Sequence, residues 1–272
     1  MQKRYIGLII TSVACLIFVL TYLLLIEPSP DVSTVAVYEV RAEEIAIVMS
    51  HDENMPFYVP RGVENKREYA QRHGYQFFLQ RNHSADIHES WSKITFTRKL
   101  MEENPQIKWF WWIDLDSIIM DPRISLEKLA LNSKKIAAYK SKDIVISWDC
   151  NGLNTGSFFV RNSLWARDFL DTMIEYSAAD RGMYGEQRVM QRLCRKDQAI
   201  MSHFSFPPLR TFAASLSHKC DLDYEADSVY KYRSGDFLVH FANCGPNDCH
   251  EDFEALWKRR VVLPAPAMNN VA

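Results

Sequence analysis

The stretch Trp109-Phe110-Trp111-Trp112-Ile113-Asp114-Leu115-Asp116 places five bulky apolar residues directly before two carboxylates. The apolar run predicts a buried strand. Side chains two apart on a strand point the same way, so Asp114 and Asp116 are expected to converge where the strand reaches the sheet edge. Hard divalent cations such as Mn²⁺ or Mg²⁺ prefer such oxygen ligands and commonly bridge a carboxylate to a diphosphate. We therefore expect a metal site and a chain that handles a nucleotide or sugar phosphate.

The two aspartates need their context, because most Asp-x-Asp triplets are solvated turn residues without a function. Here an apolar strand pattern precedes them, and residues 117–122 follow as Ser-Ile-Ile-Met-Asp-Pro. This arrangement puts both acids at a strand terminus, which is where open α/β sheets bind ligands. Metal binding is therefore favoured over a solvated turn.

The composition bounds the class of protein. The chain has 272 residues, of which 47% are hydrophobic, and a net charge of −2. This length can bury one sizeable core and suggests one domain or two small ones. Basic residues are scattered among acidic ones without a basic patch, so a nucleic-acid partner is not expected.

Residues 5–26 form an uncharged, largely apolar segment preceded by Lys3 and Arg4. About 20 apolar residues cross a bilayer, and flanking cations stay on the cytoplasmic side. A cleaved signal peptide has an apolar core of only about 7 to 15 residues and a small-residue cleavage site, which this segment lacks. We expect a membrane signal anchor over residues 5–26, a cytoplasmic tail over residues 1–4, and a lumenal remainder.

Two further features fit a lumenal domain. Asn82-His83-Ser84 is a glycosylation sequon. Some of the cysteines after the anchor can pair in an oxidising compartment, and their odd number leaves at least one free or intermolecular. The spacing Cys244-x₄-Cys249-His250 also suggests zinc, but a second ligand pair at a suitable spacing is missing. The five cysteines are Cys150, Cys194, Cys220, Cys244 and Cys249.

Strand and helix patterns alternate after a short stem at residues 27–43, which contains Pro, Ser and Glu and lacks apolar periodicity. The alternation over residues 44–272 predicts one α/β domain with a mainly parallel sheet and helices on both faces. Strands are expected at 45–49, 75–80, 109–113, 136–139, 144–147, 156–160 and 237–241. Helices are expected at 62–73, 90–103, 125–131, 163–177, 186–196 and 251–260, with Ser163 as an N-cap and Gly74 as a terminator.

Three other segments carry polar residues in positions suited to chemistry. Residues 149–158 place Gly and small polar residues ahead of a strand, which lets the backbone approach a ligand closely. Glu186 and Gln187 open a helix, where the helix dipole by itself favours a carboxylate. His240 lies in an apolar strand, where a hydrogen-bonded core histidine is the commoner outcome. Each of these signals is weak when it is taken alone.

The order of these segments resembles the fungal and plant α-galactosyl-, α-mannosyl- and α-xylosyltransferase family of Golgi type II membrane enzymes. The resemblance covers roughly residues 45–250. Its most specific segments are Leu153-Asn154-Thr155-Gly156-Ser157-Phe158 and the His-Phe-x-x-Cys pattern of residues 240–244, whereas Asp-x-Asp is common to many transferases. Further matches are Glu64-Asn65, His73-Gly74-Tyr75, Trp91-Ser92-Lys93-Ile94, Arg98-Lys99-Leu100-Met101, Trp111 to Asp116 and Glu186-Gln187.

The resemblance implies a GT-A-type α/β/α sandwich, a Rossmann-like nucleotide-sugar-binding domain behind the N-terminal transmembrane helix. It also implies a Golgi membrane protein with a single pass, type II orientation and a lumenal catalytic domain. By this analogy Asp114 and Asp116 hold Mn²⁺, with Mg²⁺ possible, against the donor diphosphate, and His240 supplies a third ligand. Lys93 would face the diphosphate, a role suited to a compact ammonium.

The remaining site residues follow from the same resemblance. Asn154 and Gly156 would line the sugar pocket, with Asp149 as a further substrate-binding residue of that segment. Glu186 and Gln187 would lie beside the anomeric carbon, where a carboxylate or amide can steady an oxocarbenium-like centre. A metal and a lysine would stabilise the departing diphosphate. Since no carboxylate is unambiguously a nucleophile, attack on the same face as the departing diphosphate is favoured over a covalent intermediate.

The donor and the phosphate contacts stay open at this point. The sequence does not decide between UDP-galactose and GDP-mannose, although Ser50 and Asp52 lie where a base or ribose could bind. Plant members of the family carry a lysine directly after the cysteine of the His-Phe-x-x-Cys pattern, and this chain has Gly245 at that position. Either Lys258 or Arg259 substitutes for that lysine, or diphosphate binding is weaker.

Two other functions compete with a transferase that moves a hexose onto a glycan. A haloacid-dehalogenase-type phosphohydrolase also ends a strand in Asp-x-Asp, but it uses the first strand of its domain, and here two expected strands precede the motif. A non-catalytic subunit that binds the donor or stabilises other Golgi glycosyltransferases is favoured by Gly245. The presence of Asp114, Asp116 and His240 argues against it.

Overall fold

The apolar run at residues 109–113 forms β3 (Trp109–Ile113), an inner strand of the sheet, in which all five residues are buried. Their side chains alternate between two hydrophobic clusters, one on each face of the sheet. Phe110 and Trp112 belong to the first cluster, and Trp109, Trp111 and Ile113 belong to the second. Full burial of such a side chain contributes roughly 1.5 to 3 kcal/mol. Because both faces of β3 are covered, its register in the sheet is fixed. The position of Asp114, the next residue, is fixed with it.

The computed structural model describes residues 40–51, 59–81, 88–131, 142–216, 229–242, 244 and 249–264. Several sequence predictions lie outside these residues: the cytoplasmic tail, the signal anchor, most of the stem, the sequon at Asn82, Asp52, the strand at 136–139 and Gly245. Among the helices of the described residues, none is both long enough and apolar enough to cross a membrane.

In the described part of the chain the main sheet has six strands in the order β2-β1-β3-β6-β5-β7. β1 pairs in parallel with β2 and β3, β5 pairs in parallel with β7, and β6 is antiparallel to both of its neighbours. The predicted mainly parallel sheet is therefore confirmed, with one reversed strand. The other strands are β1 (Ile45–His51), β2 (Gln76–Arg81), β5 (Ile144–Asp149), β6 (Gly152–Arg161) and β7 (Phe204–Ser205).

β6 begins four residues earlier than its sequence pattern predicted. Asp149 pairs with Gly152, so β5 and β6 form a tight hairpin, and Gly152 takes the positive φ of 121° that this turn needs. The expectation of a loop before a strand at 156–160 was therefore wrong. Leu153 pairs with Trp148 of β5, and the carbonyl of Gly156 accepts from the amide of Asp114 just after β3, so this stretch belongs to the strand although its register with β5 shifts between Ile146 and Trp148.

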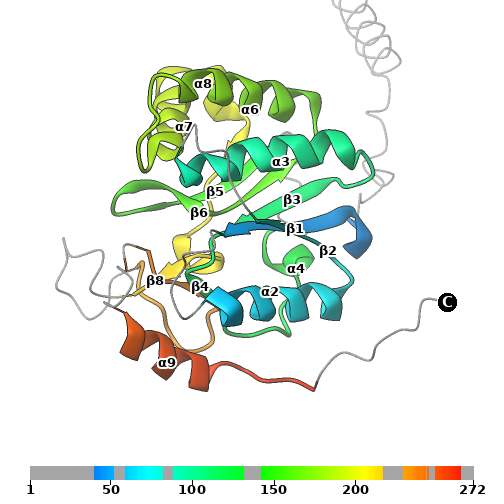
Figure 1. The fold of residues 1–272 in the computed structure, drawn as a ribbon, viewed down its shortest axis with the longest axis vertical. Coiled ribbons are helices and arrows are strands. Elements are labelled where there is room, and N and C mark those ends of the chain that lie inside the picture. The colour runs from blue at the N-terminus through cyan, green and yellow to red at the C-terminus, as the bar shows by residue number, and fades with distance from the viewer. Residues whose placement is uncertain are drawn as a thin grey trace, which may run out of the picture. The chain divides into compact units, whose positions relative to one another are not determined.

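Helices cover both faces of the sheet, as the alternation predicted (Figure 1). On one face lie α3 (Ser92–Glu103), α6 (Leu164–Ser177), α7 (Gly185–Lys196) and α8 (Gln198–Ser202). The other face carries α2 (Val59–His73) and α4 (Leu126–Leu129). Ser163 caps α6 by accepting a hydrogen bond from the amide of Ala166, which confirms the predicted N-cap. Short 3₁₀ helices lie at η2 (Ala42–Glu44), η3 (Glu89–Trp91) and η4 (Leu209–Thr211).

A second sheet, which the sequence patterns did not predict, forms from three short strands of the described residues. Its order is β4 (Ser117–Ile119), β9 (Leu238–His240) and β8 (Ala214–Ser215). The antiparallel register sets Ser117 opposite His240. The last described helix, α9 (His250–Arg259), packs on this region through Phe253, which contacts Phe241. In this small sheet β9, from the C-terminal part of the chain, pairs with β4, which follows shortly after β3.

Three of the cysteines that the structure describes are disulfide-bonded. Cys244 and Cys249 are bonded to each other, and Cys150 is also disulfide-bonded. The sulfurs of Cys244 and Cys249 are therefore not available as thiolate ligands, and the zinc alternative is wrong. Cys194 is a buried free thiol.

Candidate active site

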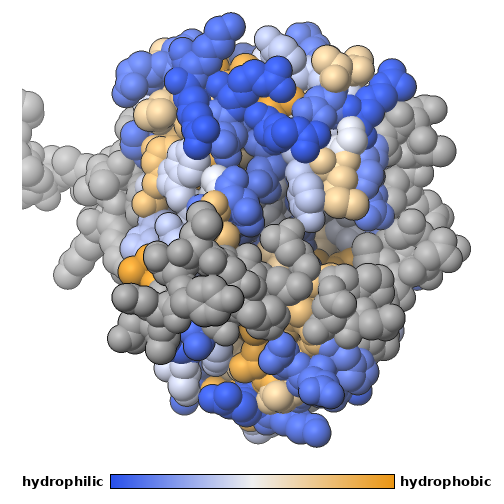
Figure 2. Space-filling model, turned by 90° about the vertical axis from the view of Figure 1, so that its left-hand side faces the viewer, coloured by the Kyte–Doolittle hydropathy of each residue, from blue (hydrophilic) through white to orange (hydrophobic). Residues whose placement is uncertain are grey.

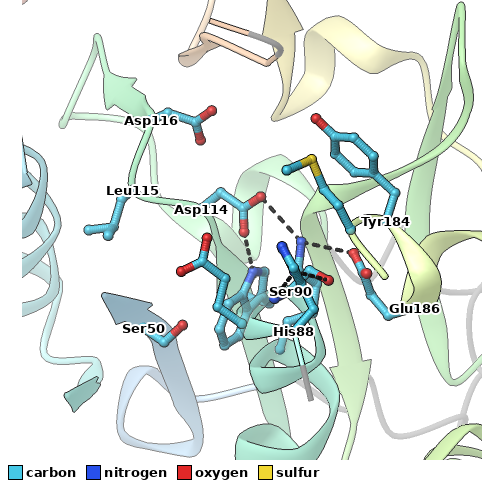
Figure 3. Close-up of a pocket in the computed structure, with 12 residues that line it drawn as sticks. Ser50, His88, Ser90, Asp114, Leu115, Asp116, Tyr184 and Glu186 are labelled. Carbon is cyan, nitrogen blue, oxygen red and sulfur yellow. Dashed lines mark hydrogen bonds and ion pairs between the residues drawn. The ribbon is translucent and has the colours of Figure 1, made fainter. Parts of the chain in front are cut away.

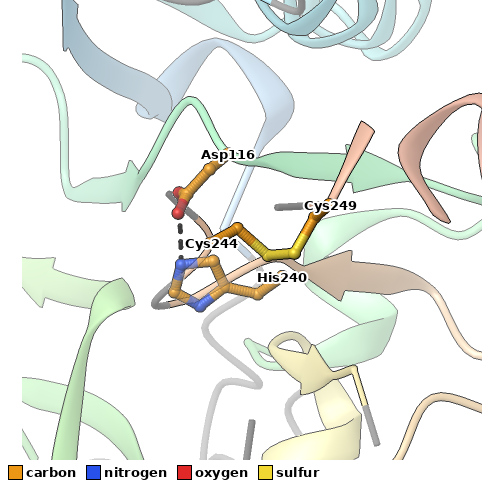
Figure 4. Close-up of a disulfide and its surroundings, with 4 residues drawn as sticks. All are labelled: Asp116, His240, Cys244 and Cys249. Atoms are coloured by element: carbon orange, nitrogen blue, oxygen red, sulfur yellow. Dashed lines mark ion pairs between the residues drawn. A yellow bond between two sulfur atoms is a disulfide. The ribbon is translucent and has the colours of Figure 1, made fainter. Parts of the chain in front are cut away.

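Asp114, Asp116 and His240 meet at the junction of the two sheets. Asp114 and Asp116 follow the end of β3, and the pairing of β4 with β9 brings His240 beside them. One ligand atom from each of the three residues lies within 4.8 Å of the others. His240 Nε2 is 3.3 Å from Asp116 Oδ1, and the disulfide between Cys244 and Cys249 closes the segment just after the histidine (Figure 4). The donor set of two carboxylates and one imidazole suits Mn²⁺ or Mg²⁺.

Backbone and side-chain hydrogen bonds hold Asp114 in place. Its amide donates to the carbonyl of Gly156 at 2.8 Å, which continues the pairing of β3 with β6. The indole of Trp112 donates to Asp114 Oδ1 at 2.6 Å, and Lys93 Nζ donates to Asp114 Oδ2 at 3.3 Å (Figure 3). These hydrogen bonds therefore fix the orientation of the Asp114 carboxylate without a bound ligand.

Gly156 leaves the space that this cluster needs. A Cβ built on Gly156 would lie 2.1 Å from His240 Cε1, 2.8 Å from His240 Nε2 and 3.1 Å from Asp114 Oδ2. Such distances are far below normal contact, so only glycine fits here. The buried Nδ1 of His240 finds no hydrogen-bond partner among the described residues, which leaves the ring orientation to packing. The cradle and its donor set fit a divalent cation.

A second charged group adjoins the first. Glu186 is fully buried in the first turn of α7, and its Oε1 lies 3.3 Å from Lys93 Nζ. Thr155 Oγ1 lies 3.2 Å from Glu186 Oε1 and 3.2 Å from Gln187 Oε1. Glu186 Oε2 has no hydrogen-bond partner within the described chain, so it can accept one from a substrate. Lys93 thus joins the paired aspartates to the carboxylate of α7.

Burial and neighbouring charges decide the protonation of these groups. Burial raises the pKa of Asp114, against the opposing effect of Lys93. Burial acts on Asp116 in the same sense, but His240 outweighs it and lowers the pKa of Asp116. Burial disfavours the charged imidazole, yet Asp116 raises the pKa of His240. Burial likewise disfavours the ammonium, and Asp114 and Glu186 more than offset it and raise the pKa of Lys93. Lys93 therefore stays charged, ready to face an anion.

Two cavities of about 260 and 350 Å³ meet over these charges and share Lys93, Asp114, Asp116 and Tyr184. The first is also lined by Ser50, His88, Glu89, Ser90, Trp112, Leu115, Met183 and Glu186 (Figure 3). The second is also lined by Asp149, Asn151, Asn154, Thr155, Gly156, Gln187, Arg188, His240 and Ala242. All ten site residues expected from the sequence therefore line one connected region.

The hairpin of β5 and β6 contributes the polar wall of the second cavity. Asn154 Nδ2 donates to Asp149 Oδ2 at 2.8 Å, and Asn154 Oδ1 accepts from the amide of Gly156 at 3.0 Å. Burial raises the pKa of Asp149, which the amide of Asn151 opposes. Both side chains are thus oriented by the strand that also provides Gly156.

Some residues at the site were missed, and one expectation failed. Tyr184 has a left-handed backbone with φ 61° and lies at the mouth of both cavities, but nothing in the sequence marks it. Trp112 was assigned to the core, although its indole nitrogen binds Asp114. Lys258 and Arg259 lie in α9, and neither lines the two described cavities, so they do not substitute for a phosphate-binding lysine there.

Asp180 anchors the loop that carries Tyr184 to α7. Its backbone carbonyl accepts from the indole of Trp91 at 3.0 Å. Its carboxylate accepts from Arg188 Nε at 3.0 Å and from Arg188 Nη2 at 2.6 Å. A Cβ at Gly185 would lie 2.3 Å from the Asp180 carbonyl, so the loop passes very close to the start of the helix. The arginines of α7 are exposed, and the upper part of the face shown in Figure 2 is largely hydrophilic.

We expect the contribution of this anchor to vanish in acid. The hydrogen bonds from Arg188 lower the pKa of Asp180. A lowered pKa contributes stability above the unfolded value of about 3.9, and this is lost as the pH falls through the folded value. Asp180→Asn should therefore lower the free energy of unfolding by up to about 1 kcal/mol at pH 7 and by progressively less between about pH 4 and pH 2. Urea unfolding of both proteins across this range measures the difference.

The exposed Asp168 of α6 supplies the control, since Asp168→Asn changes the same charge elsewhere on the surface. A deficit of Asp180→Asn that stays constant down to pH 2 would contradict the assignment.

Comparisons with known proteins show the family of this chain. The model of the galactosyl transferase GMA12/MNN10 family matches residues 41–251. An uncharacterized alpha-1,2-galactosyltransferase of Schizosaccharomyces pombe is 33% identical over 224 residues, covering 70% of this chain and 65% of that protein. A probable alpha-1,6-mannosyltransferase of Saccharomyces cerevisiae is 32% identical over 220 residues, covering 69% of this chain and 56% of that protein. The chain thus spans less than two thirds of the length of both relatives.

The fold itself is similar to a solved structure. The crystal structure of a glycosyltransferase involved in the glycosylation of the major capsid of PBCV-1 superposes with a TM-score of 0.60 at 17% identity, covering 77% of this chain and 98% of that chain. This likeness shows a mixed α/β glycosyltransferase fold.

Proposed function

We propose, from the premise that this chain belongs to the galactosyl transferase GMA12/MNN10 family, that it is a metal-dependent α-hexosyltransferase that retains the anomeric configuration. It would move galactose from UDP-galactose or mannose from GDP-mannose onto a glycan of glycoproteins or polysaccharide. The domain would be of the GT-A type, and residues 5–26 would anchor it as a type II protein with its catalytic part in the Golgi lumen. The phosphohydrolase alternative has no support, since the family is one of transferases and the acids follow the third strand.

The observation that carries the proposal is the cage of Asp114, Asp116 and His240, with Gly156 leaving room beside it. A bare pair of aspartates is common on protein surfaces, but here a buried imidazole lies 3.3 Å from one of them and is packed against a glycine. When bound, a divalent cation supplies positive charge where the diphosphate departs. Mn²⁺ fits this mixed nitrogen and oxygen set, and Mg²⁺ is a possible substitute.

The chain's own residues account for the other requirements of glycosyl transfer. Lys93 offers an ammonium that two carboxylates keep charged despite its burial, so it can bind the leaving diphosphate. Ser50 lies in the first cavity at the end of β1, a suitable place for the base or ribose. Asp149, Asn154 and Gly156 would line the place of the sugar in the second cavity.

Glu186 and Gln187 would lie beside the anomeric carbon. Glu186 is fully buried, and its Oε1 is engaged by Lys93 and Thr155. A carboxylate held by an ammonium and a hydroxyl is a poor nucleophile, because those contacts stabilise its charge before any attack. We therefore favour attack of the acceptor on the same face as the departing diphosphate, with Glu186 steadying the positive charge at the anomeric carbon.

A donor screen on the purified chain tests the proposal. Hydrolysis of UDP-galactose or GDP-mannose is expected in Mn²⁺ and should be lost in EDTA. Glu186→Gln should lower turnover on the order of 100-fold with Mn²⁺ binding retained, because the site loses a charge at the reacting centre. Glu175→Gln, on the exposed side of α6, is the control and should match the wild type.

The same donor screen distinguishes a transferase from the second candidate function, a non-catalytic subunit. A chain that binds Mn²⁺ and a donor but turns over no nucleotide sugar would be a non-catalytic subunit that binds the donor or stabilises other Golgi glycosyltransferases. Gly245, at the position where plant members have lysine, is the feature that favours this alternative. Product anomers formed with an acceptor, read by NMR, would test retention of configuration.

A further inference from the structure

Lys66 is a charged residue of α2 whose side chain is completely buried, with 0% exposure. Removing an ammonium from water costs several kcal/mol unless its partners compensate. Burial lowers the pKa of Lys66 to about 7, although Asp116 and Asp114 oppose that effect. A lysine with such a cost is best understood through the groups that it contacts.

The contacts of Lys66 lie on either side of Asp116. Its Nζ donates to the carbonyl of Leu115 at 3.5 Å and to the carbonyl of Ser117. The carbonyl of Asp116 itself accepts from the amide of Phe241 at 2.7 Å. The turn that carries Asp116 is therefore held by α2 on one side and by the residue after His240 on the other.

Two more residues on the same face of α2 hold the following segment. Asn65 Oδ1 accepts from the amide of Ile119 at 2.8 Å, and Asn65 Nδ2 donates to the carbonyl of Ile119 at 3.2 Å. A Cβ at Gly62 would lie 2.8 Å from the carbonyl of Leu115, so glycine permits this close approach. Gly62 and Lys66 are four residues apart, which places them on one side of the helix.

We propose that Lys66 and Asn65 are positioning residues that hold the Asp116 turn in the geometry needed to bind a divalent cation. The role of that cation rests on the proposed function. Each side chain replaces hydrogen bonds that the short backbone segment 115–119 would otherwise make to water, so the segment cannot relax away from His240.

A purely structural lysine predicts something different. Its replacement would lower the free energy of unfolding but leave the cation affinity of the folded molecules unchanged. Residues that orient metal ligands from behind typically change affinity by about 10- to 100-fold when they are replaced. Cation affinity measured on folded protein therefore separates the two roles.

The test compares Lys66→Met and Asn65→Ala with the wild type. Arg67→Met is the matched control, because Arg67 follows on the same helix and forms an exposed ion pair with Glu64. Free Mn²⁺ is counted by electron paramagnetic resonance during titration of the full chain, at a temperature where circular dichroism shows each variant folded. Lys66→Met should weaken Mn²⁺ binding by about 10- to 100-fold, Asn65→Ala by less, and Arg67→Met by under about twofold. Asn65 is partly exposed, so its variant gives a result if Lys66→Met does not fold.

A second measurement needs no metal. Hydrogen exchange of peptides covering residues 114–119 should be faster in Lys66→Met and Asn65→Ala than in the wild type or Arg67→Met. Wild-type Mn²⁺ affinity in the folded variants would overturn the inference, whatever the exchange of this segment. If the wild type binds no Mn²⁺, the metal assignment of the proposed function fails, and the exchange of this segment alone then decides whether α2 holds it.

Discussion

Asp116→Asn is expected to remove Mn²⁺-dependent donor turnover almost completely while leaving the fold intact. The amide keeps the size of the side chain but loses the negative charge that faces His240 at 3.3 Å. A carboxylate ligand contributes to holding the cation that stabilises the departing diphosphate, an effect worth several kcal/mol. Since each 1.36 kcal/mol changes a rate tenfold, turnover should fall on the order of 1,000-fold. Initial rates of nucleotide-sugar hydrolysis across a Mn²⁺ series measure the loss.

Asp121→Asn is the matched control, because Asp121 lies just after β4 and its carboxylate pairs with the exposed Arg123 outside the cavities. It should keep wild-type turnover. Full turnover in a folded Asp116→Asn protein would refute the metal assignment, whatever the donor.

Gly156→Ala is expected to have the second largest effect, through shape alone. The added methyl group would overlap His240 Cε1 at 2.1 Å. Gly156 is held in place because its carbonyl accepts from the amide of Asp114 and its own amide donates to Asn154 Oδ1. The ring of His240 must therefore shift away from the aspartates. We expect a loss of about 1 to 3 kcal/mol in the free energy of unfolding from overpacking. Mn²⁺ affinity should fall by at least about 100-fold, since a ligand is displaced.

Calorimetric Mn²⁺ titration together with urea unfolding measures both effects. Gly182→Ala is the control, because a Cβ at Gly182 would have no neighbour closer than 3.8 Å. Wild-type Mn²⁺ affinity in a folded Gly156→Ala protein would show that His240 is not a ligand.

Much of the architecture was predictable because it depends on local patterns. The apolar run of β3, the cap at Ser163 and the helices around α3, α6 and α7 appear where residue spacing placed them. These features follow from propensity, capping and the periodicity of buried residues, which act over a few residues. The extension of β6 to Gly152 was not predictable, because hairpin pairing with β5 outweighed the preference of Gly and Asn for turns.

The residues of the candidate site also differ in how well the sequence predicted them. Asp114 and Asp116 were identifiable from the chain alone, since they end a buried strand. His240 by itself read as a core histidine, and its role came only from the resemblance to a family. Lys66 gave no signal at all, because a lysine within a helix pattern usually faces water.

Residue order thus determined the longer strands, most helices and the pair of acids, since each arises from interactions between near neighbours. The tertiary structure decided the reversed direction of β6, the small sheet that joins β4 to β9, and the burial of Lys66 beneath the Asp116 turn. Those outcomes depend on which distant segments pair and pack. The free energy of such pairing arises only when distant segments meet in the folded chain, so it cannot be predicted from any short stretch of sequence.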